Sequence, residues 1–275
     1  MDNLDTIDYN TPDAGDLYDE LPLWSAPFGL WILDRVPLGQ TSTILDLGCG
    51  TGFLSIELAE RCGPSSTVIA VDPWAAAMER LRRKIRHRGL ANIQLKEVDA
   101  VGLDLPDQSI DVIVSNLGVN NFMDPGAVMR VCSRLARPGA AFLLTTNLVG
   151  HMAEFYAVFR KVLLTTGQGD RIEALDSHIN HRATIASVSA SLANAGFGVS
   201  EVDVSAFRLR FASGSALLRH YFIRLGFLPA WAEVPTADKV RPTFEALENE
   251  LNALALERGE IALTIPMACI FARRE

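Results

Sequence analysis

The stretch ILDLGCGTG, residues 44 to 52, constrains the fold of this chain more than any other. It is an apolar run that passes into a turn with glycine at every second position: Gly48, Gly50 and Gly52. Each glycine inside a strand or helix costs conformational entropy, so three of them in five residues indicate a turn where the backbone must be bare. Close approach of a ligand to the backbone, directly after a buried strand, accounts for such a turn.

Apolar strand-like runs alternate with amphipathic helical segments around this turn. Strands are expected at 43–48, 67–72, 93–100, 109–116 and 139–147, and helices at 53–62, 75–89 and 125–135. The strands are continuous apolar runs, which is typical of a parallel sheet covered on both faces. The alternation therefore predicts a doubly wound α/β fold with helices on both faces of the sheet.

The second half continues the pattern and then departs from it. Helices are expected at 152–163 and 183–195, strands at 198–211 and 263–274, and two amphipathic helical patterns, 215–227 and 244–256, between those strands. A connection of about fifty residues with its own helices is usually functional, so we expect a helical cap over a substrate pocket at about 212–260. Its aromatic residues fit either a flat acceptor or packing on the sheet; they are Tyr221, Phe222, Phe227, Trp231 and Phe244.

Composition and charge narrow the function classes. With 275 residues and 49% hydrophobic content the chain can bury one large core. Residues 1–34 hold eight acidic residues and no lysine or arginine, and the remainder is balanced, so a nucleic-acid substrate is not expected. The basic stretch RLRRKIRHR, 80–88, keeps an apolar stripe at helical spacing, so its charges are expected on a solvated helix face.

No run of apolar residues is long enough to span a membrane, and the N-terminus has no secretion-signal pattern, so we expect a cytoplasmic protein. The four cysteines, Cys49, Cys62, Cys132 and Cys269, are widely spaced and form no metal-binding pattern. We expect four reduced thiols and no metal site.

Spacing decides which ligand the glycine turn suits. The dinucleotide fingerprint needs glycine or alanine at the sixth position, where this chain has Phe53, so the pattern is GxGxG rather than GxGxxG. Asp72 ends the second expected strand, where a carboxylate can accept both hydroxyls of a ribose. Asp99 ends the third, followed by Ala100, where a carboxylate and a backbone N–H can read an adenine edge.

Together, the segments ILDLGCGTGFLSIELA, AVDP, EVDA and SIDVIVSN, within residues 40–150, resemble the class I S-adenosylmethionine-dependent methyltransferases. The resemblance implies a Rossmann-like sheet of seven strands, the last antiparallel beside the fifth. It implies S-adenosyl-L-methionine as cofactor and S-adenosylhomocysteine as product. The chain then divides into a lead-in and cofactor lid (1–34), a cofactor-binding core (35–150) and a C-terminal half with the cap (151–275).

The resemblance also implies a role for each matching residue. The implied contacts are Asp46, Gly48, Cys49, Gly50 and Gly52 for the methionine portion, Asp72 for the ribose, Pro73 and Trp74 beside the adenine, Asp99 and Ala100 at its edge, Asn116 and Leu117 near the carboxylate and sulfonium, and Tyr18 and Trp24 in the lead-in.

Structural roles compete with some of these assignments. Asp46 can instead bond within its own turn, and Asp72 can be a helix N-cap ahead of Pro73. Asp111 opens its strand and is expected to be structural. Whether residues 1–16 are ordered without ligand is left open.

A sulfonium methyl group is already activated, so the enzyme chiefly aligns a nucleophile and excludes water. No catalytic residue is therefore assigned, and His151, directly after the fifth strand, is the best-placed candidate for handling an acceptor proton, ahead of His178, His181 and His220. The stretch SNLGVNNF lacks the Asn/Asp-Pro-Pro-Tyr/Phe loop of the family's nucleic-acid amino methylators. Thiols too few to cluster argue against an arsenic-methylating branch.

The favoured hypothesis is a methyltransferase that acts on an oxygen, nitrogen or carbon atom of a small-molecule acceptor. Two alternatives stay open: a non-catalytic S-adenosylmethionine-binding or regulatory protein and, disfavoured by Phe53, an NAD(P)-dependent oxidoreductase. The sequence also leaves a homodimer open.

Overall fold

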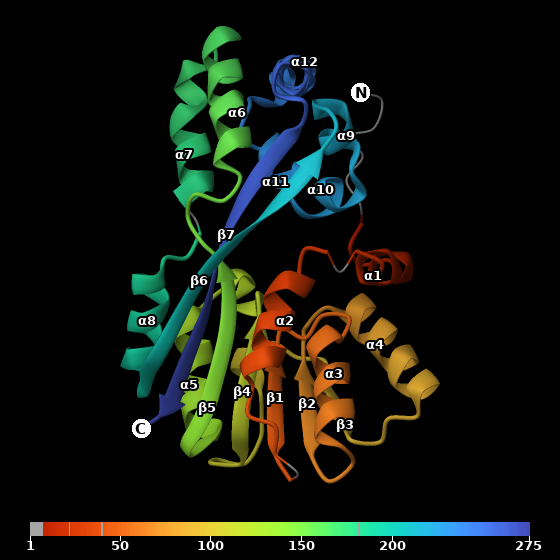
Figure 1. Cartoon of the computed structure of the whole chain (residues 1–275), viewed down its shortest axis with the longest axis vertical. Coiled ribbons are helices and arrows are strands. Elements are labelled where there is room, and N and C mark those ends of the chain that lie inside the picture. Colours follow the sequence, from red (N-terminus) through yellow and green to blue (C-terminus); the bar gives the residue numbers. More distant parts are fainter. Residues whose placement is uncertain (1–7, 22, 40, 181) are drawn as a thin grey trace. The chain divides into compact units, whose positions relative to one another are not determined.

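The computed structural model describes residues 8–21, 23–39, 41–180 and 182–275. Its seven strands form one sheet in the order β3-β2-β1-β4-β5-β7-β6 (Figure 1). The strands are β1 (Thr43–Leu47), β2 (Thr67–Val71), β3 (Ile93–Lys96), β4 (Ile110–Asn116), β5 (Ala136–Asn147), β6 (Phe197–Phe211) and β7 (Ile261–Arg274).

The first five strands are parallel, and β7 runs antiparallel beside β5, with Leu144 opposite Ile270. Strand order reverses between β1 and β4, the place where ligands bind in open α/β sheets. The Rossmann-like fold and the antiparallel last strand are thus confirmed. The third strand is shorter than predicted, because it ends at Lys96 and leaves Asp99 in the following loop.

The helices lie where the apolar periodicity predicts them, with additions at the start and in the second half. They are α1 (Pro12–Asp19), α2 (Ala26–Arg35), α3 (Phe53–Cys62), α4 (Ala75–Arg88), α5 (Pro125–Leu135), α6 (Ala153–Thr165), α7 (Ile172–Asn180), α8 (Ile185–Asn194), α9 (Gly214–Arg219), α10 (Tyr221–Gly226), α11 (Leu228–Ala232) and α12 (Val240–Arg258). The single pattern 215–227 forms two helices, because the backbone of His220 is extended. None of the described helices is long and apolar enough to cross a membrane.

The chain forms two compact units, each assembled from separate stretches. The sheet unit comprises residues 8–147, 183–205 and 267–275, and the helical unit comprises 148–182 and 206–266. In the sheet unit a core of buried side chains, Ile44, Leu58 and Val112 among them, packs between the strands and α2 and α3. This core fixes the strand ends from which the candidate site is built.

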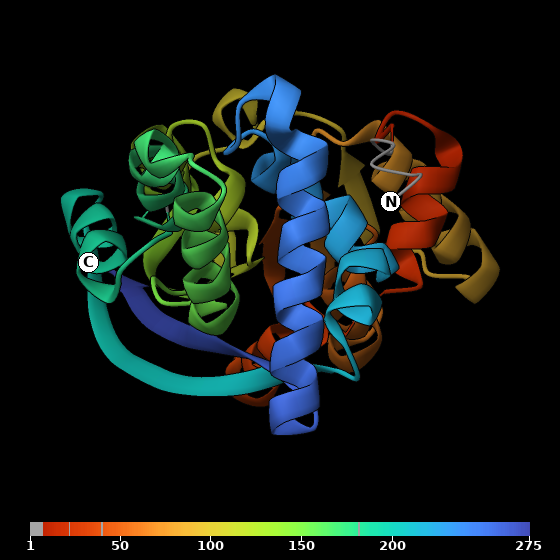
Figure 2. The ribbon, with the colours of Figure 1, turned by 90° about the horizontal axis from the view of Figure 1, so that it is seen from above.

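In the helical unit, α12 packs beside α9 and α6 (Figure 2). Aromatic side chains fill the unit: Phe155 stacks on Trp231 with ring centroids 4.0 Å apart, and Trp231 stacks on Phe227 at 5.6 Å. Phe244 is also buried, against Phe159. Of the aromatic residues predicted either to line a pocket or to pack, Phe222, Phe227, Trp231 and Phe244 therefore pack against other aromatic rings of the helical unit.

Candidate cofactor site

The three glycines of the turn after β1 serve two different purposes. All three have positive φ angles, which favour glycine. A Cβ on Gly48 would lie 2.9 Å from Gly118 Cα, and one on Gly52 would lie 2.1 Å from a methyl group of Leu81, so these two are bare because the protein packs on them. A Cβ on Gly50 would meet nothing within 4 Å. Gly50 is therefore the position of the three where the backbone is open to a ligand.

Asp72 links this open glycine to the second strand. One carboxylate oxygen accepts the Gly50 N–H at 2.8 Å, and the other accepts the Trp74 N–H at 2.9 Å. Helix α4 begins only at Ala75, with Trp74 as its N-cap residue, so the N-cap alternative for Asp72 is wrong. Burial raises the pKa of Asp72, against these two hydrogen bonds. Each oxygen keeps a lone pair, so the carboxylate can still accept two hydroxyl groups.

Asp46 and Cys49 lie beneath the turn. Asp46 is 1% exposed and accepts the Ser55 hydroxyl at 2.6 Å, which ties β1 to α3 rather than to its own turn. Burial raises the pKa of Asp46 to about 7. The Cys49 thiol is buried 3.6 Å from the sulfur of Met78, and burial raises its pKa well above the usual range. Both side chains are thus buried and turned toward protein partners, Asp46 toward Ser55 and Cys49 toward Met78.

Asn116 and Leu117 end the fourth strand beside the glycine turn. The Asn116 amide accepts the Thr145 hydroxyl at 2.8 Å and donates to the Ser25 carbonyl at 3.1 Å, which joins β4, β5 and the start of α2. Leu117 has a φ of 64°, a strained conformation for a branched side chain and one that concentrates at functional sites. Both residues lie at the predicted edge of the sheet, with Asn116 held in place by protein partners.

Asp99 and Ala100 occupy the loop beyond β3. Asp99 is exposed and caps a short 3-10 turn, Ala100–Gly102, by accepting the Val101 N–H at 2.8 Å. Ala100 is buried. The prediction that Asp99 ends the strand is wrong, because β3 ends three positions earlier, at Lys96. Asp99 still lies on the carboxyl side of the sheet.

The N-terminal segment gathers aromatic rings around the Asp72 region. The Tyr18 ring contacts the Trp74 ring edge-on at 5.3 Å, and Tyr9 does so at 5.9 Å. Burial, followed by the nearby Asp72 carboxylate, raises the pKa of Tyr18. Pro73 is exposed between Asp72 and Trp74. Tyr18 of the lead-in therefore lies beside Trp74 and near Asp72, two of the residues implied as cofactor contacts, whereas Trp24 packs against Phe28.

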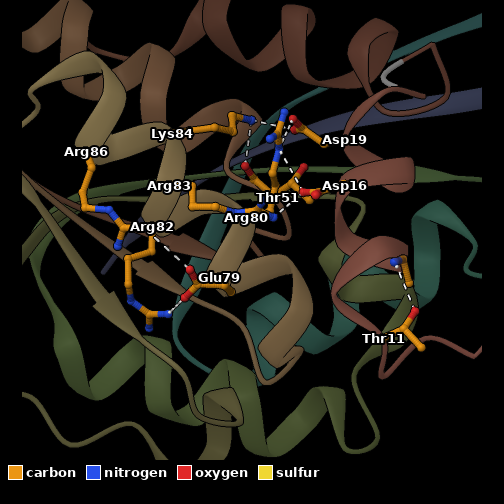
Figure 3. Close-up of polar contacts among 11 residues, drawn as sticks. Thr11, Asp16, Asp19, Thr51, Glu79, Arg80, Arg82, Arg83, Lys84 and Arg86 are labelled. Carbon is orange, nitrogen blue, oxygen red and sulfur yellow. Dashed lines mark hydrogen bonds and ion pairs between the residues drawn. The ribbon is translucent and has the colours of Figure 1, made fainter.

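The basic face of α4 is only in part the solvated face predicted from the sequence: Arg86, His87 and Arg88 are exposed, whereas the earlier part of the face is covered. Helix α1 packs on it, and Asp16 and Asp19 of α1 pair with Arg80, Arg83 and Lys84 (Figure 3). Thr11 caps α1 through its hydroxyl, at 3.3 Å from the Ala14 nitrogen. We call this set of ion pairs the α1–α4 clasp. The clasp explains why the acidic N-terminal segment and the basic stretch of α4, more than sixty residues apart in the sequence, carry opposite charges.

Lys84 connects the clasp to the glycine turn. Its ammonium group donates to Asp19 at 2.6 Å and to the Thr51 carbonyl at 2.8 Å. A hollow of about 610 Å³ lies here, between α1, the start of α3 and α4. Lys84 is not predicted as a site residue from its own motif, although the acidic run ahead of β1 and the basic run of α4 together indicate that the two segments pair.

His151 belongs to the helical unit, in a buried polar cluster. Its Nε2 atom lies 3.3 Å from the Arg182 Nε donor and 3.5 Å from the Tyr156 hydroxyl. Tyr156 in turn lies 3.1 Å from Nε2 of His178 and accepts the Trp231 indole N–H at 3.2 Å. Burial, then the electrostatic effects of Arg182 and His178, lowers the pKa of His151 to about 3.

This pKa makes His151 a poor general base at neutral pH, because a base of that strength holds a proton only weakly. The residue therefore does not fit the predicted role of taking an acceptor proton. His220 caps α9, apart from this cluster, and His181 lies outside the described residues.

The chain is similar to known methyltransferases. Residues 38–178, about half of the chain, match the family model for a methyltransferase domain. Curated relatives include demethylmenaquinone methyltransferase of Lactobacillus johnsonii, 39% identical over 38% of this chain and 43% of its own length. The enzyme of the same name from Anoxybacillus flavithermus is 30% identical over 48% of this chain and 57% of its length. The chain thus matches about half the length of these relatives.

Solved structures share the fold at low sequence identity. YcgJ protein from Bacillus subtilis has a TM-score of 0.60 at 15% identity, covering 90% of this chain and 97% of that one. Geranyl diphosphate methyltransferase has a TM-score of 0.55 at 16% identity, covering 91% and 78%. With the GxGxG turn, the strand order and the family match in agreement, this chain belongs to the class I S-adenosylmethionine-dependent methyltransferase family.

Proposed function

We propose that the protein transfers a methyl group from S-adenosyl-L-methionine to a small-molecule acceptor. The observation that carries the proposal is the open face of Gly50, whose N–H is held by Asp72 at the point where strand order reverses. A ligand there meets bare backbone, a carboxylate with acceptor positions to spare and the Tyr18 and Trp74 rings. These features fit a methionine portion, a ribose and an adenine respectively.

When bound, the cofactor supplies a methyl group activated by positive sulfur. The chain's residues then bind, orient and exclude water. Asp72 holds the ribose hydroxyls, and the clasped α1 covers them through Tyr18. No residue is assigned as a base, because His151 is too weakly basic and Asp46 is turned toward Ser55 beneath the turn.

The acceptor is proposed to be recognised by the second half of the chain, including the cap at about 212–260. The names of the relatives make a demethylmenaquinone-type quinol the first acceptor to try, beside simple phenols and carboxylic acids. A cytoplasmic location, a substrate other than nucleic acid and a homodimer stay predictions.

Isothermal calorimetry with S-adenosylhomocysteine, NAD and NADP tests the cofactor class. We expect binding of S-adenosylhomocysteine alone, abolished by Asp72→Ala and retained by Asp34→Asn, which changes an exposed carboxylate at the end of α2. Binding of a nicotinamide cofactor instead would refute the proposal. If S-adenosylhomocysteine binds but no acceptor is methylated in mass spectrometry, the non-catalytic alternative is favoured.

A further inference from the structure

The buried cluster around His151 contains a hydrogen-bond donor without an acceptor. Arginine only donates, so the Arg182 Nε–H requires a lone pair on His151 Nε2. A neutral imidazole carries its one proton on the other nitrogen, which places it on Nδ1. The side chain is 1% exposed, and Nδ1 has no hydrogen-bond partner. His151 therefore carries a buried Nδ1–H donor without an acceptor inside the helical unit.

Such an arrangement is costly unless something uses it. Leaving a buried polar group unpaired costs about 1–3 kcal/mol, and native proteins rarely retain one without a reason. The next residue, Met152, has a φ of 53°, another strained position. The backbone is fixed there by the Met152 N–H, which donates to the Thr264 carbonyl at 2.8 Å. Strain and an unpaired donor at adjacent residues indicate a binding role rather than simple packing.

Arg182 brings a positive charge to the same cluster. Its pKa is lowered, chiefly by burial, and among the described residues it forms no ion pair with a carboxylate. Partly buried charges are normally paired, so a guanidinium without a carboxylate favours an anionic partner. A carboxylate or phenolate oxygen matches both this cation and the Nδ1–H of His151.

Aromatic rings surround the pair. The Phe227 ring lies 5.8 Å from the His151 ring at an angle of 36°, and it also stacks on Trp231. The Tyr156 ring contacts the His151 ring edge-on at 5.8 Å. Flat apolar side chains of this kind suit an aromatic body attached to the anionic oxygen.

We propose that the helical unit recognises an aromatic acceptor through an anionic oxygen, with His151 Nδ1–H and Arg182 as the two donors. The inference rests on the proposed methyl transfer and names its acceptor class. His151 then orients the acceptor as a neutral donor and removes no proton. Tyr156 contacts the imidazole through its hydroxyl, and His178 and Trp231 position that hydroxyl through their own hydrogen bonds to it.

Direct binding of a model ligand tests this site without turnover. Wild-type protein is titrated with 2-naphthoate and with the neutral 2-naphthamide, followed by calorimetry. We expect naphthoate to bind more tightly, and Arg182→Met to weaken it on the order of tenfold to a hundredfold while leaving naphthamide unchanged. Arg219→Met, which removes an exposed charge of α9 in the same unit, is the matched control.

Two variants of His151 separate donation from packing. His151→Phe keeps a ring and loses the N–H, so the preference for naphthoate over naphthamide is expected to vanish. His151→Asn places an amide N–H near the Nδ1 position and is expected to restore part of it. The proposal is overturned if wild-type protein binds naphthoate and naphthamide equally, or if Arg219→Met loses as much naphthoate affinity as Arg182→Met.

Nitrogen-15 NMR of histidine-labelled wild-type protein tests the same point when variants unfold. The expected result is a His151 proton on Nδ1 whose resonance moves downfield when naphthoate is added; a proton on Nε2, or no movement, overturns the proposal. Calorimetry with S-adenosylhomocysteine on the same sample keeps the two proposals distinguishable. Cofactor binding without a naphthoate preference refutes only the acceptor site, and the reverse refutes only the methyltransferase proposal.

Discussion

The α1–α4 clasp is expected to contribute to cofactor affinity. The Asp19 carboxylate accepts hydrogen bonds from Lys84 at 2.6 Å and from Arg80 at 2.9 Å. Asp19→Asn removes the negative charge of this acceptor. Charge-assisted hydrogen bonds contribute about 1.5–3 kcal/mol when buried, and exposed pairs about 0–1 kcal/mol. The Asp19 and Lys84 side chains keep 14% and 20% exposure, so we expect Asp19→Asn to weaken docking of α1 by about 1–2 kcal/mol.

Docking of α1 places Tyr18 against Trp74 and near Asp72, so its loss is expected to appear in the affinity for S-adenosylhomocysteine. One to two kcal/mol corresponds to roughly five- to thirtyfold weaker binding by calorimetry. High salt is expected to weaken binding to the wild type and to change the variant less, because the screened pairs are already broken. Glu79→Gln is the control, since Glu79 pairs with Arg82 on the outer side of the same helix.

An Asp19→Asn affinity within twofold of the wild type would refute this reasoning, as would an equal loss in Glu79→Gln. The pH dependence gives a second check. Burial acts to raise the pKa of Asp19, but the hydrogen bonds from Lys84 and Arg80 outweigh it and lower the pKa below 3.8. A lowered carboxyl pKa stabilises the folded form above pH 3.8, and the contribution is lost as the pH falls through the folded pKa.

Three further predictions follow from the site and the buried cluster. Gly50→Ala is expected to abolish S-adenosylhomocysteine binding with a small loss of thermal stability. Gly52→Ala forces a Cβ against Leu81, so it is expected to lower the melting temperature much more. Equal melting temperatures of the two variants would contradict the different roles of the two glycines. The raised pKa of Asp46, about 7, means that the folded state binds more protons than the unfolded state between about pH 4 and 7, so stability falls as pH rises through that range. Asp46→Asn should flatten this decline in thermal unfolding, and an unchanged slope would show that Asp46 is ionised when folded. The pKa of His151, about 3, means that stability falls as pH drops below about 6.5, and His151→Phe should reduce that loss in acid denaturation followed by circular dichroism.

Much of the sheet unit was predictable because its signals are local. Continuous apolar strands, helical periodicity and a glycine turn can each be recognised from a few adjacent residues. The handedness of parallel crossovers then limits how the strands and helices assemble. Asp72 was placed to within one residue for the same reason, since the apolar run before it is local; it directly follows β2 instead of ending it. Asp99 was misplaced because β3 stops early at Lys96, and strand ends depend on pairing with a neighbour rather than on the strand's own residues.

The sequence by itself determined the fold class, the glycine turn after the first strand and the family, because these depend on periodicity and spacing. Tertiary structure decided which glycine is open, since only packing places Leu81 over Gly52 and Gly118 against Gly48 while leaving Gly50 clear. It also decided that acidic α1 neutralises basic α4 and that His151 is a neutral donor beside Arg182. Charge pairing and pKa depend on which side chains meet across long sequence separations and on how deeply those side chains are buried. A local sequence pattern indicates neither the partner nor the burial.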